Sequence, residues 1–194
     1  MPTYDPATAL LVVDVQNDFA DPTGSLSVRE GDQVVPLANA QIRLARGSGA
    51  LVVATQDWHP PHTPHFAQDG GIWPVHCVRD TWGAAFHPAL EPIEEVVRKG
   101  IDGKDGYSGF SVRDPETGEV GATALERRLR DARIERLVIC GLATDYCVVE
   151  TVGDARMLGY RVEVLAAGIR AVDLRSGDGD RAIARMRDAG AELV

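Results

Sequence analysis

Cysteine is scarce in this chain, and its number is odd. Three cysteines, Cys77, Cys140 and Cys147, are spread over 194 residues. Small secreted domains that depend on disulfides carry cysteines at a higher density and usually in even numbers. We therefore expect no disulfide framework, reduced thiols and a cytoplasmic location.

Long apolar runs, excess positive charge and a leader segment are also missing. The longest apolar runs have five or six residues, whereas a helix that spans a bilayer needs about 20. Met1 to Asp5 include no basic region or cleavage site, so no signal peptide is expected. Acidic residues outnumber lysine and arginine by 29 to 20, a net charge of −9. Because nucleic acids and anionic membranes attract positive charge, neither is an expected partner.

What the chain does contain is a regular alternation of short apolar runs and amphipathic segments. The runs predict strands at 9–13, 51–55, 95–98, 136–140, 161–165 and 191–194. The amphipathic segments predict helices at 34–46, 122–132, 145–158 and 181–189. Apolar strands separated by helices indicate a parallel sheet that is covered on both faces. We expect a single α/β domain over residues 1–194, a three-layer α/β/α sandwich with a mostly parallel six-stranded sheet.

Polar or reactive side chains follow four of the predicted strands. Asp14, Asp57 and Lys99 each come directly after an apolar run or close to its end, and the loop 141–147 follows a fourth run. In parallel α/β folds, ligands bind beyond the carboxyl ends of the strands. The sequence therefore predicts a functional site at this edge of the sheet.

Cys147 is the candidate nucleophile. It falls in the first turn of the predicted helix 145–158, where unpaired N–H groups and the helix dipole favour an anion. That position predicts a lowered thiol pKa, and the same N–H groups could hold the oxyanion of a tetrahedral intermediate. The alternative, a small buried structural residue, is retained for Cys77 and Cys140.

A thiol that expels an amine needs a proton relay. No histidine follows Cys147, because all five lie between positions 59 and 87. Asp14 and Lys99, one of only two lysines, complete a candidate Cys-Asp-Lys triad as acid/base and as cation. Taken singly, Asp14 could instead be a helix cap or solvated loop residue, and Lys99 a surface lysine.

The stretch 58–92 shows little hydrophobic periodicity and contains a candidate metal site. Asp57 and His59 point to the same side of an extended chain, and His65 and His76 follow. Three imidazoles and a carboxylate suit Zn²⁺, Fe²⁺ or Mn²⁺, and their spacing is not that of a zinc finger. The alternative is a loop with surface histidines, the interpretation kept for His62 and His87.

Together these segments resemble the nicotinamidase (pyrazinamidase) family of the isochorismatase-like cysteine hydrolases. The matching segments are Val12–Phe19, Thr55–His59, Trp73–Cys77, Lys99–Gly100 with Tyr107–Phe110, and Gly141–Val148. They occur in the family's order and cover nearly the whole chain. The resemblance implies the isochorismatase-like fold and hydrolysis of nicotinamide to nicotinate and ammonia in NAD salvage, with pyrazinamide as a further substrate.

The resemblance also implies a role for each catalytic residue. Cys147 attacks the carboxamide and forms a thioester, Asp14 takes and returns the proton, and Lys99 balances these charges. The backbone N–H groups of Ala143 and Cys147 form the oxyanion hole, and the peptide bond before Ala143 is cis.

The ligand sites follow from the same resemblance. Asp57, His59 and His76 match metal ligands, and His65 matches a ligand that only some members use. One divalent ion is implied, Zn²⁺ first with Fe²⁺ or Mn²⁺ as alternatives, and it binds the pyridine nitrogen directly or through water. The substrate-binding residues are Phe19 and Trp73, which wall the flat ring, and Tyr107, which closes the pocket. The Gly-rich, charged loop 100–106 leaves the preference among nicotinamide analogues open.

Two alternative functions stay open at this point. One is another amide or vinyl-ether hydrolase of the same superfamily, although metal-free relatives lack the Asp57-x-His59 and Trp73–Cys77 segments. The other is a catalytically silent metal-binding or interaction module. The expected partner is the small molecule nicotinamide, and the apolar helix faces could serve a homo-oligomer as readily as a core.

Overall fold

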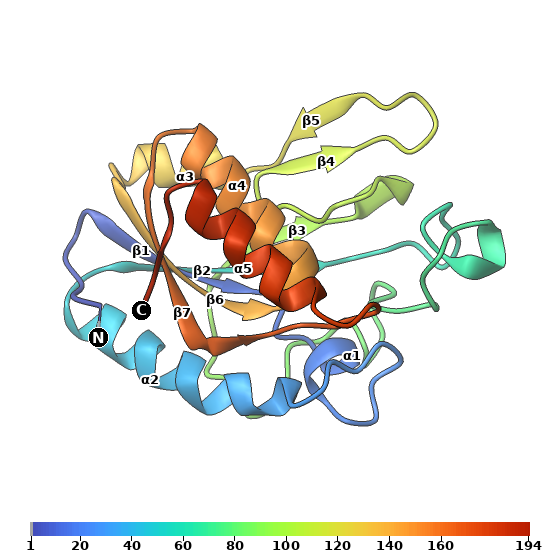
Figure 1. The fold of residues 1–194 in the computed structure, drawn as a ribbon, viewed down its shortest axis with the longest axis horizontal. Coiled ribbons are helices and arrows are strands. Elements are labelled where there is room, and N and C mark those ends of the chain that lie inside the picture. The colour runs from blue at the N-terminus through green and yellow to red at the C-terminus, as the bar shows by residue number, and fades with distance from the viewer. Residues whose placement is uncertain (1) are drawn as a thin grey trace.

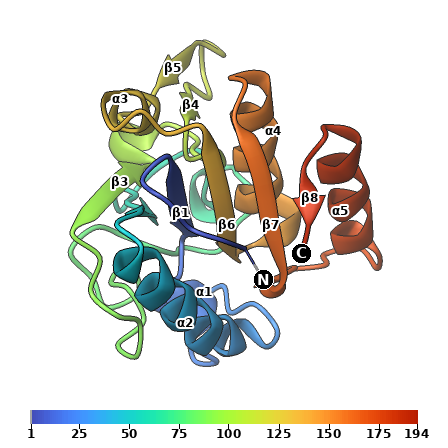
Figure 2. The same ribbon diagram turned by 90° about the vertical axis from the view of Figure 1, so that its left-hand side faces the viewer.

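The fold is built on one parallel sheet of six strands. The computed structural model describes residues 2–194. The strands are β1 (Thr8–Val13), β2 (Leu51–Asp57), β3 (Glu95–Lys99), β6 (Arg136–Leu142), β7 (Arg161–Arg170) and β8 (Glu192–Leu193). They lie in the order β3-β2-β1-β6-β7-β8, and every neighbouring pair is parallel (Figure 1 and Figure 2). The predicted six-stranded sheet is confirmed.

Helices cover both faces of this sheet. On one face are α1 (Asn17–Ala20) and α2 (Val34–Gly47), and on the other are α3 (Leu125–Asp131), α4 (Val149–Met157) and α5 (Asp178–Asp188) (Figure 2). Because successive strand residues point to opposite faces, Leu10 packs in the core beneath α2 and Leu11 in the core beneath α4. The three-layer sandwich is therefore the one the sequence predicted.

Three departures from the predicted elements affect the site or its surroundings. A two-stranded antiparallel hairpin, β4 (Ser111–Arg113) and β5 (Val120–Ala122), was not predicted, because its strands are only three residues long and largely uncovered. The helix predicted to begin at residue 122 begins instead at Leu125, since Ala122 belongs to β5. The helix predicted at 145–158 is interrupted: a π-helical turn, Thr144–Val148, precedes α4.

The long segment 58–94 has little regular structure, in agreement with its lack of periodicity. The structure describes it throughout, and it forms one 3₁₀ turn (Ala67–Asp69) and single bridges such as Phe66 to Trp73. It is nevertheless anchored, because Phe66, Trp73 and Cys77 are buried. Over the whole described chain, no helix has the length and apolar character needed to cross a membrane.

Candidate active site

The carboxyl ends of three neighbouring strands bring a lysine and two aspartates into contact. Asp14 follows β1 directly, Asp57 ends β2 and Lys99 ends β3. The Lys99 Nζ lies 2.8 Å from Asp14 Oδ2 and 2.5 Å from Asp57 Oδ1. Lys99 is 1% exposed although lysine is rarely buried without a partner. The alternative of a surface lysine is therefore wrong.

Cys147 follows a fourth strand, β6, and contacts the same lysine. It lies in the π-helical turn that leads from β6 into α4, and its Sγ is 3.4 Å from Lys99 Nζ. Gly141 makes the approach of β6 to β1 possible: its φ is 127°, and a Cβ there would collide with the Val13 backbone. The peptide bond between Leu142 and Ala143 is cis, as the resemblance implied.

The three ammonium hydrogens of Lys99 have three acceptors: the Asp57 carboxylate, the Gly106 carbonyl and the Cys147 sulfur. Asp14 also contacts the ammonium, through Oδ2, as an ion pair at 2.8 Å. Its Oδ1 accepts a hydrogen bond from Thr55 Oγ1 at 2.7 Å, and its Oδ2 accepts none within the described residues. The Asp14 carboxylate also lies beside the thiol, within 4.8 Å of the Cys147 sulfur.

Burial and neighbouring charges set the protonation of this group. Burial alone would lower the pKa of Lys99, but the Asp14 and Asp57 carboxylates outweigh it and hold that pKa well above its usual value. Burial raises the pKa of Asp14, although Lys99 opposes part of that shift. For Asp57, burial would raise the pKa, but Lys99 and His59 overcome it and keep the pKa below its usual range.

The pKa of the Cys147 thiol is shifted in the direction opposite to the sequence prediction, which was a lowered pKa. Burial raises its pKa well above the usual value, and the two nearby carboxylates add to the rise while Lys99 opposes it. The prediction considered the helix N-terminus but not the loss of solvent around the sulfur, which disfavours the charged thiolate. The resting thiol therefore keeps its proton and needs a base to become a nucleophile.

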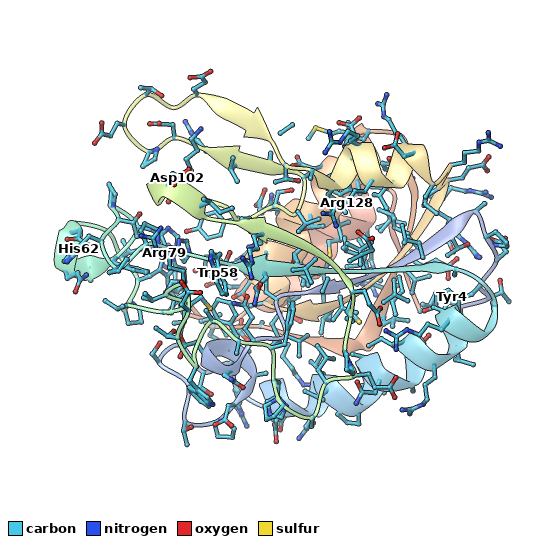
Figure 3. The ribbon with its side chains drawn as sticks, turned by 180° about the vertical axis from the view of Figure 1, so that it is seen from behind. Tyr4, Trp58, His62, Arg79, Asp102 and Arg128 are labelled. Atoms are coloured by element: carbon cyan, nitrogen blue, oxygen red, sulfur yellow. The ribbon has the colours of Figure 1, made fainter. Side chains whose placement is uncertain are left out.

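The histidine cluster lies beside these residues. His59, His65 and His76 are all buried, and one ring nitrogen from each lies within 4.8 Å of the others. Asp57 borders the cluster, with Oδ2 at 3.7 Å from His59 Nε2. His62 lies outside the cluster; its ring is 80% exposed and sits at an outer end of the molecule (Figure 3).

These residues fit a divalent metal ion. Both ring nitrogens of His59 are buried with no hydrogen-bond partner in the described chain. An unpaired buried polar group costs about 1–3 kcal/mol, so a ligand for His59 is expected. Burial lowers the pKa of His76 to about 4, which keeps its imidazole neutral and able to coordinate. Three imidazoles and a carboxylate are a donor set that Zn²⁺, Fe²⁺ and Mn²⁺ accept.

A second group, Asp14, Asp57 and Cys147, also brings three potential ligand atoms within 4.8 Å. Here the Lys99 ammonium already contacts all three side chains and supplies the balancing positive charge. The two clusters are therefore chemically different: one is built around an internal cation, and the other offers neutral imidazoles to an external one.

A pocket opens onto both clusters. Its walls include the three predicted ring-binding residues and several that were not predicted. The lining consists of Phe19, Leu26, Asp57, His59, His65, Trp73, His76, Gly106, Tyr107, Ala143, Tyr146, Cys147 and Val172. Trp73 donates its indole N–H to the Tyr107 hydroxyl at 2.9 Å and meets the Tyr146 ring edge-on, with centroids 4.7 Å apart. The flat apolar walls suit an aromatic ring.

The backbone N–H of Ala143 is available to a ligand. Ala143 lines the pocket immediately before the π-helical turn, and its N–H donates to no acceptor among the described residues. Cys147 also lines the pocket. Backbone N–H groups in such a position are what an oxyanion hole requires.

Several supporting residues escaped the sequence-based predictions. The Gln16 side chain donates to the Asp57 carbonyl and accepts from the Asp57 N–H, both at 2.8 Å, and so fixes the end of β2. Asp18 accepts the Cys77 N–H at 2.7 Å and the Ser25 N–H at 3.0 Å. The available signals were that both residues closely follow Asp14 after a buried strand and that both fall in the Val12–Phe19 segment that matches the family.

Comparison with known proteins agrees with this geometry. Residues 8–194 match the isochorismatase domain. The chain is 41% identical to the nicotinamidase of Escherichia coli strain K12, covering 97% of this chain and 94% of the relative. It superposes on the crystal structure of PnC1 from L. infantum in complex with nicotinate with a TM-score of 0.89, 35% identity and coverage of 100% and 95% of the two chains.

A second solved structure is that of the pyrazinamidase of Pyrococcus horikoshii in complex with zinc, with a TM-score of 0.86 and 39% identity. The superposition covers 97% of this chain and 99% of that one. The chain belongs to the isochorismatase family. Within that family it is a hydrolase of the nicotinamidase/pyrazinamidase group.

Proposed function

We propose that this chain hydrolyses nicotinamide to nicotinate and ammonia through a thioester on Cys147. The observation that carries the proposal is the buried contact of Lys99 with Asp14, Asp57 and Cys147, at the base of an aromatic pocket beside three histidines. The similarity to nicotinamidases and to a structure that holds nicotinate supports the choice of substrate. Pyrazinamide has a similar flat ring and carboxamide, so we propose it as a second substrate.

The first chemical step is attack by the sulfur. Because the resting thiol keeps its proton, Asp14 takes that proton as the Cys147 Sγ bonds to the carboxamide carbon and the C=O bond becomes a C–O⁻ single bond. The N–H groups of Ala143 and Cys147 stabilise this oxyanion. Lys99 keeps a positive charge beside Asp14 and Cys147 throughout.

The second step expels the amine. Asp14, now carrying the thiol proton, gives it to the carboxamide nitrogen as the C–N bond breaks, and ammonia leaves. The thioester remains on Cys147. Asp14 then takes a proton from a water molecule that attacks the thioester carbon. As the C–S bond breaks, Asp14 returns that proton to the Cys147 sulfur, and the nicotinic acid that is released ionises to nicotinate, its proton passing to ammonia to give ammonium. Atoms and charges balance over the cycle, and Asp14 ends as it began.

Binding of the substrate uses the walls of the pocket. Phe19 and Trp73 would pack against the ring, and Tyr107 would cover it through its link to Trp73. We propose His59, His65 and His76, with Asp57, as the ligands of one divalent ion, Zn²⁺ in the first place. When bound, that ion supplies a Lewis acid for the pyridine nitrogen and so favours one orientation of the ring.

The test is ammonia release from nicotinamide by the purified full-length chain, with Cys147→Ala measured alongside. We expect release by the wild type and a loss of at least about 10⁴-fold in the variant, because it removes the nucleophile. Cys140→Ala is the matched control. This second buried cysteine lies inside β6, where burial raises its pKa to about 12, and it does not line the pocket.

The possible results separate the proposal from its nearest alternatives. No release by a wild type that binds zinc would reject nicotinamide as the substrate and direct a panel of aromatic and aliphatic carboxamides at the same site. Release that persists in Cys147→Ala would reject the thioester. A wild type inactive on every amide would favour a binding module.

A further inference from the structure

One histidine of the cluster, His65, contacts a carboxylate from another segment through one ring nitrogen. The Nδ1 atom of His65 lies 2.9 Å from Asp105 Oδ1, and the His65 ring is almost wholly buried. A carboxylate only accepts hydrogen bonds, so the neutral His65 ring carries its proton on Nδ1 and leaves the Nε2 lone pair free. Asp105 belongs to the Gly-rich loop 100–106, and its side chain has no role in the chemistry proposed above.

The other two histidines are held differently. His76 Nδ1 lies 2.7 Å from the Pro74 carbonyl, which is two residues away in its own loop. His59 has no hydrogen bond at either ring nitrogen within the described chain. His65 is therefore the only one of the three whose ring orientation depends on a side chain from a distant segment, 40 residues further along the chain.

We propose that Asp105 is a positioning residue for the metal site: it fixes the tautomer and orientation of His65 so that Nε2 faces His59 and His76. The inference rests on the metal site of the proposed function. A carboxylate behind a ligating imidazole also makes the ring a stronger electron donor, which tightens metal binding. Asp105 acts through His65 and is not itself placed among the ligands.

The backbone of Asp105 is braced from its other side. Its N–H and C=O exchange hydrogen bonds with Arg113 of β4, both at 2.7 Å. The unpredicted hairpin β4–β5 thus holds the residue that orients His65. The next residue, Gly106, accepts a hydrogen bond from Lys99, so the same short segment also contacts the catalytic lysine.

A second histidine–aspartate contact in the same region differs from the His65–Asp105 contact in its exposure and in its neighbours. His62 Nδ1 lies 3.2 Å from Asp69 Oδ1, but its ring is 80% exposed and faces no other imidazole. Exposed ion pairs of that kind contribute little. The His65–Asp105 contact instead involves a side chain that is 7% exposed and whose ring centroid lies 5.0 Å from that of His59 and 5.5 Å from that of His76.

The experiment measures zinc affinity by competition with a chromophoric chelator, on full-length protein from which metal has been removed. The variants are Asp105→Ala, His65→Ala and the double variant. Asp102→Ala is the matched control, since Asp102 lies in the same loop but is exposed and turned to the surface (Figure 3). Ammonia release is measured separately, so failure of the amidase proposal is seen independently.

We expect Asp105→Ala to weaken zinc binding by about 10–100-fold, the usual cost of losing a residue that orients a metal ligand. Asp102→Ala should bind zinc as the wild type does. Because Asp105 acts through His65, adding Asp105→Ala to His65→Ala should have no further effect. Asp105→Asn, which keeps an oxygen acceptor but loses the charge, should show an intermediate loss.

Three results would overturn the inference. They are unchanged zinc affinity in Asp105→Ala, an equal loss in Asp102→Ala, and a full further loss when Asp105→Ala is added to His65→Ala. If Asp105→Ala does not fold, Asp105→Asn is compared with Asp102→Asn, and equal affinities would reject the role. A wild type that binds no zinc would reject it together with the metal site.

Discussion

The two halves of the site are built in different ways. Asp14 and Lys99 sit at or just beyond the carboxyl ends of β1 and β3, where the sheet register places them, and Cys147 follows β6 in the π-helical turn. His59, His65 and His76 come from the irregular segment 58–94. Asp14, Lys99 and Cys147 form the strand half of the site, and the three histidines form its loop half. Strand ends are positioned by backbone hydrogen bonds between strands, whereas a loop has to be positioned by individual side chains.

The supporting contacts show this contrast. On the strand side, the ladder between β2 and β3 pairs Asp57 directly with Lys99. On the loop side, Asp18 holds the backbone next to His76, and Asp105 holds the ring of His65. Asp57 is the residue common to both halves, because it contacts Lys99 and borders His59. Changes at the strand ends should therefore affect catalysis, and changes in the loop should affect binding.

The largest expected effect is that of Asp14→Asn on turnover. The amide keeps the shape of the side chain but cannot take the thiol proton, so we expect kcat to fall by about 10³–10⁴-fold. Zinc affinity should stay unchanged, because Asp14 belongs to the strand half. Steady-state kinetics and metal content check this prediction, and retention of most of the kcat would reject the proton relay.

Lys99→Ala should affect both catalysis and stability. Loss of the ammonium leaves Asp14 and Asp57 buried without a partner, which costs about 3–5 kcal/mol in the free energy of unfolding. We expect kcat to fall by about 10²–10³-fold, because a charge stabiliser is lost. Lys104→Ala is the control, as the other lysine of the chain. An effect confined to KM would make Lys99 a binding residue only.

Metal removal tests the loop half. Chelation should weaken nicotinamide binding by at least about tenfold, equivalent to about 1.4 kcal/mol. The sheet should remain folded, because its core does not include the histidines. Calorimetric titration with nicotinamide and thermal melting of the same sample check this. A large fall in melting temperature with unchanged nicotinamide affinity would contradict the division between the two halves.

The smallest expected effect is that of Trp73→Phe. The aromatic wall is kept, but the hydrogen bond to Tyr107 is lost. A neutral hydrogen bond contributes about 0.5–1.5 kcal/mol, so KM should rise by roughly 2–10-fold with kcat nearly unchanged. Trp82→Phe, at an exposed tryptophan outside the pocket, is the control. A fall in kcat without a change in KM would show that Trp73 contributes to the chemistry and not only to binding.

Much of the strand half could be predicted from the sequence. The apolar runs 9–13 and 51–55 located β1 and β2, and the polar residues after them were placed at one edge of the sheet. The structure brings Asp14, Asp57, Lys99 and Cys147 together at that edge. The strands were recognisable because a parallel sheet buries both faces and leaves a continuous apolar signal.

Less of the loop half could be predicted. The histidines were candidates through their chemistry and through the family resemblance, but neither Asp105 nor the hairpin that braces it was identified. Strands of three residues carry no usable periodicity, and a residue 40 positions from its partner leaves no local pattern. The thiol pKa was also predicted in the wrong direction, because the extent of burial around Cys147 was not visible in the sequence.

The sequence by itself determined the alternation of strands and helices and the types of residue at the strand ends, since hydrophobic period and residue chemistry are local properties. Only the tertiary structure decided which side chains meet, how deeply the Cys147 thiol and the Lys99 ammonium are buried, and which carboxylate contacts which imidazole. Those are properties of solvent exclusion and of contacts between distant segments. They exist only once the chain has folded.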